Sequence, residues 1–168
     1  MTEIHLIRIE SPVGELIACA TDVGICLLEI SGRKNIDRQF NSLLKLLSGY
    51  IVENETKYLK DLKLELAEYF EGKRRFFTVP LHLVGTEFHK KVWNELLKIP
   101  YGKTVSYKQL AENIGNPKAV RAVANANALN KISIIVPCHR VIGSNGSLTG
   151  YASGLDNKRW LLGLENNG

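Results

Sequence analysis

The spacing of apolar residues changes along the chain, and this change divides the sequence into two parts. In the first thirty residues apolar and polar side chains alternate in three short runs, IHLIRIE, GELIACA and GICLLEI, with turns at Gly14 and Gly24. A period of two is typical of strands with one buried face, so we expect an antiparallel meander here. From Thr86 onward apolar residues recur every three or four positions, which indicates helices.

Two helices and a short strand should complete the first part. Helical spacing of apolar residues predicts one helix over residues 36–50 and a second over 57–71, with Gly72 as its C-cap. The run TVPLHLV, which follows the basic GKRRFF, predicts a short strand. We therefore expect residues 1–84 to form a small α/β domain in which helices cover an antiparallel sheet.

The second part, residues 85–168, carries closely spaced helix signals. Thr86 can cap a helix that stops at Pro100, and Ser106 with Gln109 forms a capping box for a helix over 107–114. These signals predict a mostly helical domain.

A third helix should follow the second almost at once. Gly115 ends the second helix, Asn116 is placed as an N-cap, and Pro117 would occupy the first helical position of a helix that reaches Ala128. Two helices joined by a tight glycine-containing turn form a helix-turn-helix signature.

The third helix, PKAVRAVANANALN, is rich in alanine and carries Lys118 and Arg121 near its start. Small side chains allow either close packing against a neighbouring helix or entry into a DNA groove, and the pattern leaves both open. Residues 86–168 carry 11 Lys/Arg against 5 Asp/Glu, whereas residues 1–85 carry 11 against 12. A basic excess confined to one half favours an anionic partner such as nucleic acid, although solubility alone could produce it.

The stretch IIVPCHRVIG places Cys138 beside His139 and Arg140 within an apolar run. A lone cysteine there is by default a small core residue, but a nearby base or cation raises the thiolate fraction that makes it a nucleophile. On an extended segment adjacent side chains point to opposite faces, so a direct bond between Cys138 and His139 is not expected. A bridging water, or a turn induced by Pro137, would be needed.

A histidine base also needs an orienting carboxylate, and two acids follow the cysteine. Asp156 lies in the polar run LDNKR, which is typical of a solvated helix start. Glu165 lies near the end of a C-terminal helix, where the helix dipole disfavours a carboxylate, so an imidazole or cationic partner would explain it. The loop GSNGSLTGYASG, residues 143–154, is either a mobile connector or a wall around a planar ligand on which Tyr151 stacks.

The run from PYGKTVSYKQLAENIGNPKAVRAVANAN to PCHRVIGSNGSLTGYASGLDNKRWLLGLE closely resembles the O6-alkylguanine-DNA alkyltransferase family, the methylated-DNA–protein-cysteine methyltransferases. The resemblance is dense over about residues 86–165 and rests on PCHRV with its spacing to Arg121, Asn130 and Glu165. It implies an RNase H-like topology for residues 1–84 and a winged helix-turn-helix for residues 85–168. The implied function is DNA repair by direct damage reversal: O6-alkylguanine, and O4-alkylthymine, is flipped out of duplex DNA and its alkyl group passes irreversibly to Cys138.

The resemblance also implies a role for each matching residue. Cys138 attacks as a thiolate, His139 takes the thiol proton through a water and is oriented by Glu165, and Tyr107 protonates the leaving guanine. Asn130 would tie together the turn before the cysteine, and Arg121 would fill the space that the extruded base leaves. The residues implied to contact DNA are Lys108, Asn116, Lys118, Ala119, Ala122 and Ser144. Those implied to form the base pocket are Pro137, Val141, Tyr151 and Ala152. Ala152 stands where many members carry serine, which puts the width of the pocket in doubt.

We expect no cofactor and no metal, because Cys19, Cys26, His5 and His82 match no compact zinc pattern and the two cysteines alternate with apolar neighbours. Three cysteines are too few for a disulfide framework, which favours a reducing cytoplasm, with nucleoid association in a prokaryote. No apolar run approaches the roughly 20 residues that span a bilayer, and the N-terminus lacks signal-peptide features. The expected partner is duplex DNA containing O6-alkylguanine, bound through the minor groove by a monomer, with no membrane association.

Two other classes of protein remain as alternatives. A DNA-binding module without transfer activity would replace the cysteine, so Cys138 argues against it. A thiol hydrolase would need an oxyanion hole and a direct Cys–His dyad. The adjacent positions of Cys138 and His139 in the chain disfavour such a dyad.

Overall fold

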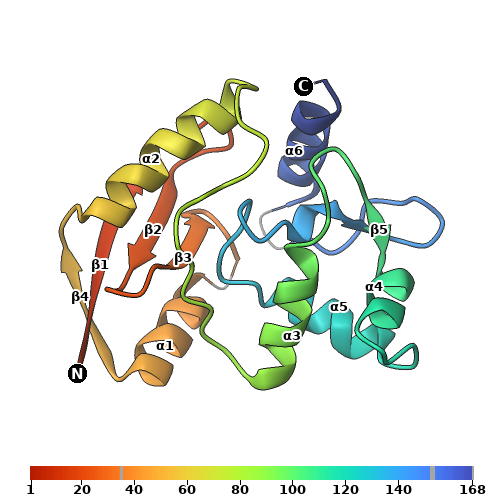
Figure 1. Ribbon diagram of the computed structural model, residues 1–168, viewed down its shortest axis with the longest axis horizontal. Coiled ribbons are helices and arrows are strands. Elements are labelled where there is room, and N and C mark those ends of the chain that lie inside the picture. The colour runs from red at the N-terminus through yellow and green to blue at the C-terminus, as the bar shows by residue number, and fades with distance from the viewer. Residues whose placement is uncertain (35, 152–153, 168) are drawn as a thin grey trace. The chain divides into compact units, whose positions relative to one another are not determined.

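A computed structural model of the protein describes residues 1–34, 36–151 and 154–167. The chain divides into two compact units, Met1–Gly85 and Thr86–Gly168. The first unit contains a four-stranded sheet with two helices, and the second is mostly helical (Figure 1). Across the described residues no helix is both long enough and apolar enough to cross a membrane.

The sheet of the first unit is mixed. Its strands are β1 (Thr2–Ile9), β2 (Leu16–Ala20), β3 (Ile25–Ile30) and β4 (Gly49–Glu53), in the order β3-β2-β1-β4. The antiparallel meander of β1, β2 and β3 confirms the prediction from alternating residues. The expectation of an antiparallel sheet is wrong at one edge, because β4 pairs with β1 in parallel.

The helix predicted over residues 36–50 ends early and gives way to β4. Helix α1 (Ile36–Leu47) stops where Ser48 takes a left-handed φ of 48°. Gly49 then lies so close to β1 that a Cβ atom there would be 2.6 Å from the Cδ1 atom of Ile4. A short apolar run such as YIV fits a strand as well as a helix, so periodicity could not separate the two.

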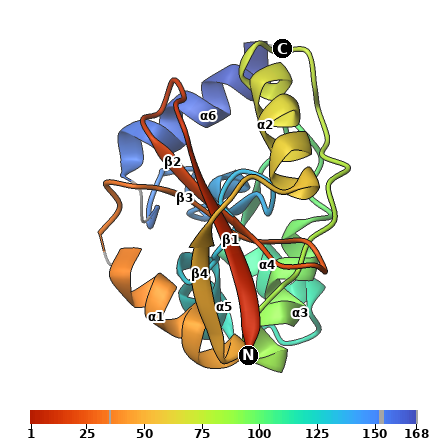
Figure 2. The ribbon, with the colours of Figure 1, turned by 90° about the vertical axis from the view of Figure 1, so that its left-hand side faces the viewer.

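Helix α2 (Lys57–Phe70) confirms the prediction for residues 57–71, and Gly72 follows it with a left-handed φ of 77°. Helices α1 and α2 lie on opposite faces of the sheet (Figure 2). The α1 side contains the apolar cluster of Ile4, Leu6, Ile17, Cys19, Cys26, Leu27, Leu43 and Val84. Cys19 and Cys26 are fully buried in this cluster, which confirms that they are core residues.

The strand predicted over residues 78–84 is reduced to a single bridge between Leu81 and Ile25. Pro80 has no N–H to give to a ladder, and its carbonyl instead accepts from the Ile25 N–H at 2.8 Å. The buried carboxylate of Glu65 on α2 anchors the segment by accepting from the N–H and hydroxyl of Thr78.

The second unit consists of short helices around the segment that carries Cys138. Thr86 caps α3 and Ser106 caps α4 through side-chain bonds from the N–H groups of His89 and Gln109, as predicted. The elements are α3 (Glu87–Leu96), β5 (Val105–Ser106), α4 (Tyr107–Asn113), α5 (Val120–Ala128), the 3₁₀ turn η1 (Cys138–Arg140), β6 (Val141–Ile142) and α6 (Leu155–Asn167). Helices α4 and α5 form the expected helix-turn-helix pair, and β5 pairs with β6 in parallel.

Helix α5 begins three residues later than predicted. The N–H of Ala119 bonds to the carbonyl of Asn116 at 3.0 Å, so residues 116–119 form a tight turn with Pro117 inside it. The prediction of Asn116 as an N-cap is therefore wrong, because proline favours the second position of such a turn as strongly as the first position of a helix.

Candidate active site

The segment before Cys138 is held in an unusual conformation by one side chain. Asn130 is 2% exposed, and its amide donates to the carbonyls of Ile132 at 3.3 Å and Val136 at 2.9 Å while its oxygen accepts from the N–H of Ile132. Ile134 has a φ of +73°, which strains a β-branched residue. Such strain persists only where the surroundings over-determine it, and the three bonds of Asn130 do so.

Cys138 lies in a turn and not in an extended strand. The Cys138 N–H bonds to the carbonyl of Val136 at 2.8 Å, and the Arg140 N–H bonds to that of Pro137 at 3.0 Å. The side chain of Cys138 is buried, with 6% of the residue exposed. The expectation of an extended segment is therefore wrong, and the alternative of a turn at Pro137 is what the structure contains.

His139 and Arg140 both turn toward Glu165 on α6. The His139 Nε2 atom is 2.7 Å from Glu165 Oε2, and Arg140 binds both carboxylate oxygens through Nε at 2.8 Å and Nη2 at 2.9 Å. Arg140 also donates from Nη1 to the carbonyl of Ile99 at 2.7 Å. All three charged or polar side chains are buried, so Arg140 compensates the carboxylate and is not a solvent-facing cation.

This environment sets the protonation states of the pair. Burial would raise the pKa of Glu165, but hydrogen bonds from His139 and Arg140 outweigh it and hold the pKa well below its usual range. Burial lowers the pKa of His139 despite its bond to Glu165. Near neutral pH the imidazole is therefore neutral and donates from Nε2 to an ionised carboxylate. The other ring nitrogen, Nδ1, is buried and has no hydrogen-bond partner among the described residues.

Lys158 on α6 is a further member of the site, and the sequence analysis missed it. Its side chain is fully buried, and its Nζ atom donates to the carbonyls of Val141 at 2.5 Å and Thr149 at 2.8 Å. Burial lowers the pKa of Lys158 to about 8, while charge on Cys138 acts in the opposite direction. The spacing offered one signal, since Lys158, Leu161 and Glu165 are three and four residues apart and share one helix face.

Tyr107, at the start of α4, faces the same group of residues. Its hydroxyl donates to the carbonyl of Thr149 at 3.1 Å, and the Lys158 Nζ atom lies 6.0 Å from the centre of its ring. Burial raises the pKa of Tyr107, and charge on Cys138 adds to this effect. The phenol therefore keeps its proton at neutral pH.

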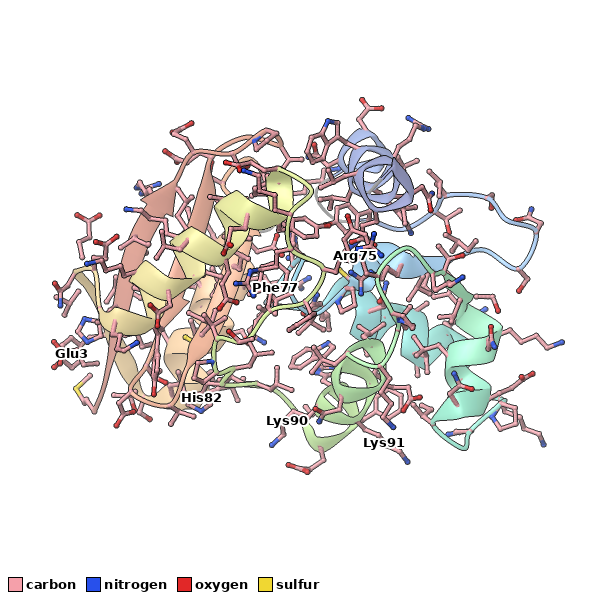
Figure 3. The ribbon with its side chains drawn as sticks, turned by 45° about the horizontal axis from the view of Figure 1, so that its top comes forward. Glu3, Arg75, Phe77, His82, Lys90 and Lys91 are labelled. Carbon is pink, nitrogen blue, oxygen red and sulfur yellow. The ribbon has the colours of Figure 1, made fainter. Side chains whose placement is uncertain are left out.

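The helix-turn-helix carries an open hollow of about 680 Å³ beside Tyr107. Lys118, Val120, Arg121 and Ala124 line the rest of it. Lys118 and Arg121 are exposed, as are Lys108 on α4, Asn116 in the turn and Ala122 on α5. Lys90 and Lys91 project outward from α3 in Figure 3 and add to the positive charge of this unit.

The other residues singled out from the sequence are placed less centrally. Ala119 is half-buried at the start of α5, and Ser144 is exposed in a turn over residues 143–147. Tyr151 is buried rather than displayed for stacking. Ala152 lies outside the described residues. The described residues contain no group of three or more His, Cys, Asp or Glu side chains arranged to hold a metal.

Comparison with known proteins matches both units. The ribonuclease-like domain of 6-O-methylguanine DNA methyltransferase matches residues 4–83, and the DNA-binding domain of that protein matches residues 87–167. The methylated-DNA–protein-cysteine methyltransferase of Methanosarcina acetivorans is 48% identical over 157 residues, which cover 93% of this chain and 94% of that relative. Crystal structures of Mycobacterium tuberculosis O6-methylguanine methyltransferase and of its OGT in complex with DNA have TM-scores of 0.83 and 0.81, each 38% identical over 98% of this chain and 93% of theirs.

A ribonuclease-like unit followed by a helix-turn-helix unit with a buried cysteine defines a DNA-repair transferase. The chain belongs to the 6-O-methylguanine DNA methyltransferase family. Its activity is that of a methylated-DNA–protein-cysteine methyltransferase, which repairs DNA by transferring an alkyl group to a cysteine of the protein.

Proposed function

We propose that the accepting cysteine is Cys138, and that the alkyl group comes from O6 of guanine or O4 of thymine in duplex DNA. The observation that carries this assignment is a buried contact of His139, the residue that directly follows Cys138. Its Nε2 atom lies 2.7 Å from Oε2 of Glu165. A neutral imidazole oriented by an ionised carboxylate is suited to accept a proton. No group in the motif would hydrolyse the resulting thioether, so each molecule reacts once.

The proton path runs through Nδ1 of His139, the ring nitrogen that has no hydrogen-bond partner among the described residues. Its Nε2 atom is committed to Glu165, so Nδ1 accepts the thiol proton through one bridging water. The thiolate electron pair then forms the S–C bond as the C–O6 bond breaks, and the bonding pair leaves on the guanine. Tyr107, which keeps its proton at neutral pH, protonates the departing base.

Lys158 supports the same step through its charge. No carboxylate in the described part of the chain pairs with this buried ammonium, and its charge interacts with that of Cys138. An ammonium near a thiol favours the thiolate. The Val141 carbonyl, which we assign with Pro137, Tyr151 and Ala152 to the base pocket, keeps one lone pair for the base while the other accepts from Lys158.

Base flipping is proposed because the target atom is unreachable inside a duplex. Arg121 on the exposed face of α5 fills the space that the guanine leaves, while Lys108, Asn116, Lys118, Ala119, Ala122 and Ser144 contact the backbone or the minor groove. The Mycobacterium tuberculosis structure in complex with DNA supports DNA binding by this chain. We propose that the protein binds DNA as a monomer. We also propose that it acts in the cytoplasm, and the three free cysteines support this location because thiols stay reduced there.

The test compares intact masses after incubation with a duplex that contains O6-methylguanine. The parent should gain the mass of one methylene, a methyl group replacing a hydrogen, on the peptide that contains Cys138, and Cys138→Ser should gain none while still binding the duplex. Cys19→Ser and Cys26→Ser are the controls, because burial raises the pKa of Cys19 far above its usual range and that of Cys26 to about 12. Mass gain in Cys138→Ser would refute the assignment. Loss of the methyl group from the duplex without any mass gain of the parent protein would indicate hydrolysis.

A further inference from the structure

The turn over residues 100–103 lies against the carboxylate of Glu165. It is closed by a hydrogen bond of 3.1 Å from the Lys103 N–H to the carbonyl of Pro100. Gly102, the third residue of the turn, donates its N–H to the Oε1 atom of Glu165 at 3.4 Å. A backbone group of this turn therefore reaches the carboxylate that we assign to the proton relay.

The direction of this N–H depends on the type of turn. Gly102 has a φ of +78°, whereas the φ of Tyr101, the residue before it, is not positive. A positive φ at the third residue alone is typical of a type II turn. In a type I turn the peptide between Tyr101 and Gly102 is turned over, so its carbonyl would point toward Glu165 in place of its N–H. The left-handed conformation of Gly102 is therefore what aims a donor at the carboxylate.

The carboxylate of Glu165 accepts hydrogen bonds on both of its oxygens. Oε1 accepts from Arg140 Nε at 2.8 Å as well as from the Gly102 N–H at 3.4 Å. Oε2 accepts from Arg140 Nη2 at 2.9 Å and from His139 Nε2 at 2.7 Å. An ionised carboxylate offers about four lone-pair positions, which these bonds match. Because the two oxygens belong to one planar group, holding Oε1 also fixes the position of Oε2 opposite His139.

The same segment of the chain also holds Arg140, the other donor to Oε1. Arg140 Nη1 donates to the carbonyl of Ile99 at 2.7 Å, and the Arg140 Cζ atom lies 5.8 Å from the centre of the Tyr101 ring. The Tyr101 hydroxyl in turn donates to the carbonyl of Leu164 on α6 at 3.4 Å. Because the turn is attached both to the guanidinium and to the helix that carries the carboxylate, it limits the rotation of that carboxylate.

We infer that Gly102 is a positioning residue for the proton that His139 accepts, an inference that rests on the role proposed above for His139. Its N–H, aimed by the type II turn, holds Oε1 of Glu165, so that Oε2 stays in line with Nε2 of the imidazole. The oriented carboxylate stabilises the imidazolium as it forms. When the N–H is turned away, the carboxylate rotates and the imidazole becomes a weaker base.

The test measures methyl transfer from free O6-methylguanine, which needs no DNA contact, at increasing base concentration and across pH. Gly102→Ala disfavours the positive φ, so the turn converts to type I and presents a carbonyl to the carboxylate. We expect the maximal rate per folded molecule to fall about 10-fold, a part of what general base catalysis contributes, with an unchanged half-saturating concentration. The acid limb of the pH–rate profile should move to lower pH, because a less stabilised imidazolium loses its proton more readily.

Two further variants separate the direction of the N–H from the other effects of a side chain. A Cβ atom at Gly102 would lie 3.3 Å from the backbone oxygen of Glu165, which is a close contact. Gly102→Asn adds the same Cβ atom but tolerates a positive φ, so it should keep most of the rate that Gly102→Ala loses. Gly72→Ala imposes the same strain at a φ of +77°, with open space around its Cβ position, and should react at the parent rate.

A double substitution tests whether Gly102 acts through the carboxylate. In a Glu165→Gln background, Gly102→Ala should slow transfer no further, because the charge that its N–H orients is already absent. A parent rate in Gly102→Ala would overturn the inference, as would a Gly102→Asn variant as slow as Gly102→Ala, or equal slowing by Gly102→Ala with and without the Glu165 carboxylate. Failure of the parent to methylate Cys138 would refute the proposed function instead.

Discussion

Burial and hydrogen bonding together set the charges of His139 and Glu165, the polar pair that follows Cys138 in the chain. Glu165 stays ionised because His139 and Arg140 both donate to it, and His139 stays neutral because burial penalises the imidazolium. These states follow from contacts between residues far apart in the sequence. The role of Arg140 could not be read from PCHRV, since its partners are Glu165 and the carbonyl of Ile99.

Glu165→Gln tests the carboxylate at this scale. We expect methyl transfer to slow about 100-fold, because a neutral amide no longer stabilises the imidazolium that forms. The same change leaves Arg140 buried without its counter-charge, so the free energy of unfolding should also fall by about 3 kcal/mol. Single-turnover rates and urea unfolding measure the two effects. Asp156→Asn, on the exposed side of the same helix, should change neither, and a parent-like rate in Glu165→Gln would exclude Glu165 from the mechanism.

Lys158→Met tests the buried ammonium through pH. Burial lowers the pKa of Lys158 to about 8, so between this value and the usual value near 10.5 the unfolded chain binds more protons than the folded one. The contribution of Lys158 to stability therefore rises as pH increases through this window. Relative to Lys158→Met, the parent should gain about 3 kcal/mol in free energy of unfolding from pH 8 to 10.5. A constant difference across this range would mean that Lys158 is not desolvated.

At the scale of helices and strands, sequence signals predicted the structure correctly where the hydrogen bonds that they imply form within a single element. The caps at Thr86 and Ser106 and the helix over residues 57–71 were predictable because the bonds involved lie within a few residues. β4 and the segment over residues 78–84 were not, because their states depend on β1 and on Glu65. Residue spacing left the turn before Cys138 only as an alternative to an extended segment, and the role of Asn130 in it was implied by the family resemblance, because the bond from the Asn130 amide to the carbonyl of Val136 cannot be read from spacing.

The start of α5 bears on a prediction about Arg121. Because α5 begins at Val120, Arg121 lies in its first turn, exposed and beside the hollow next to Tyr107. If Arg121 fills the space that the extruded base leaves in the DNA, Arg121→Ala should slow repair of a paired duplex by at least about 10-fold. Its reaction with the free base should be unaffected, because only the duplex requires unpairing, which costs about a few kcal/mol. A mismatch opposite the lesion should partly restore the rate. Equal slowing on all three substrates would place Arg121 in the pocket itself, and Arg121→Lys tests whether charge alone suffices.

At the scale of the whole molecule, charge and chemistry lie in the same unit. Residues 86–168 carry the entire positive excess and also every residue proposed for transfer, whereas residues 1–85 carry 11 Lys/Arg against 12 Asp/Glu. This distribution was readable from sequence, because net charge does not depend on contacts. It assigns the electrostatic attraction for DNA to the second unit.

The salt dependence of DNA binding tests this assignment. Each lysine that neutralises a phosphate releases counterions, so the logarithm of the association constant falls with the logarithm of salt concentration by about 0.9 per contact. Lys118→Ala and Lys108→Ala, both exposed on the helix-turn-helix, should each reduce that slope by about 1 and weaken binding to all sequences alike. Lys45→Ala, exposed on α1 of the first unit, removes the same charge and should leave the slope unchanged. Titrations of an unmodified duplex from low to high salt measure all three variants. Equal reductions for Lys45 and Lys118 would show that the net charge of the protein, and not the helix-turn-helix, governs its attraction to DNA.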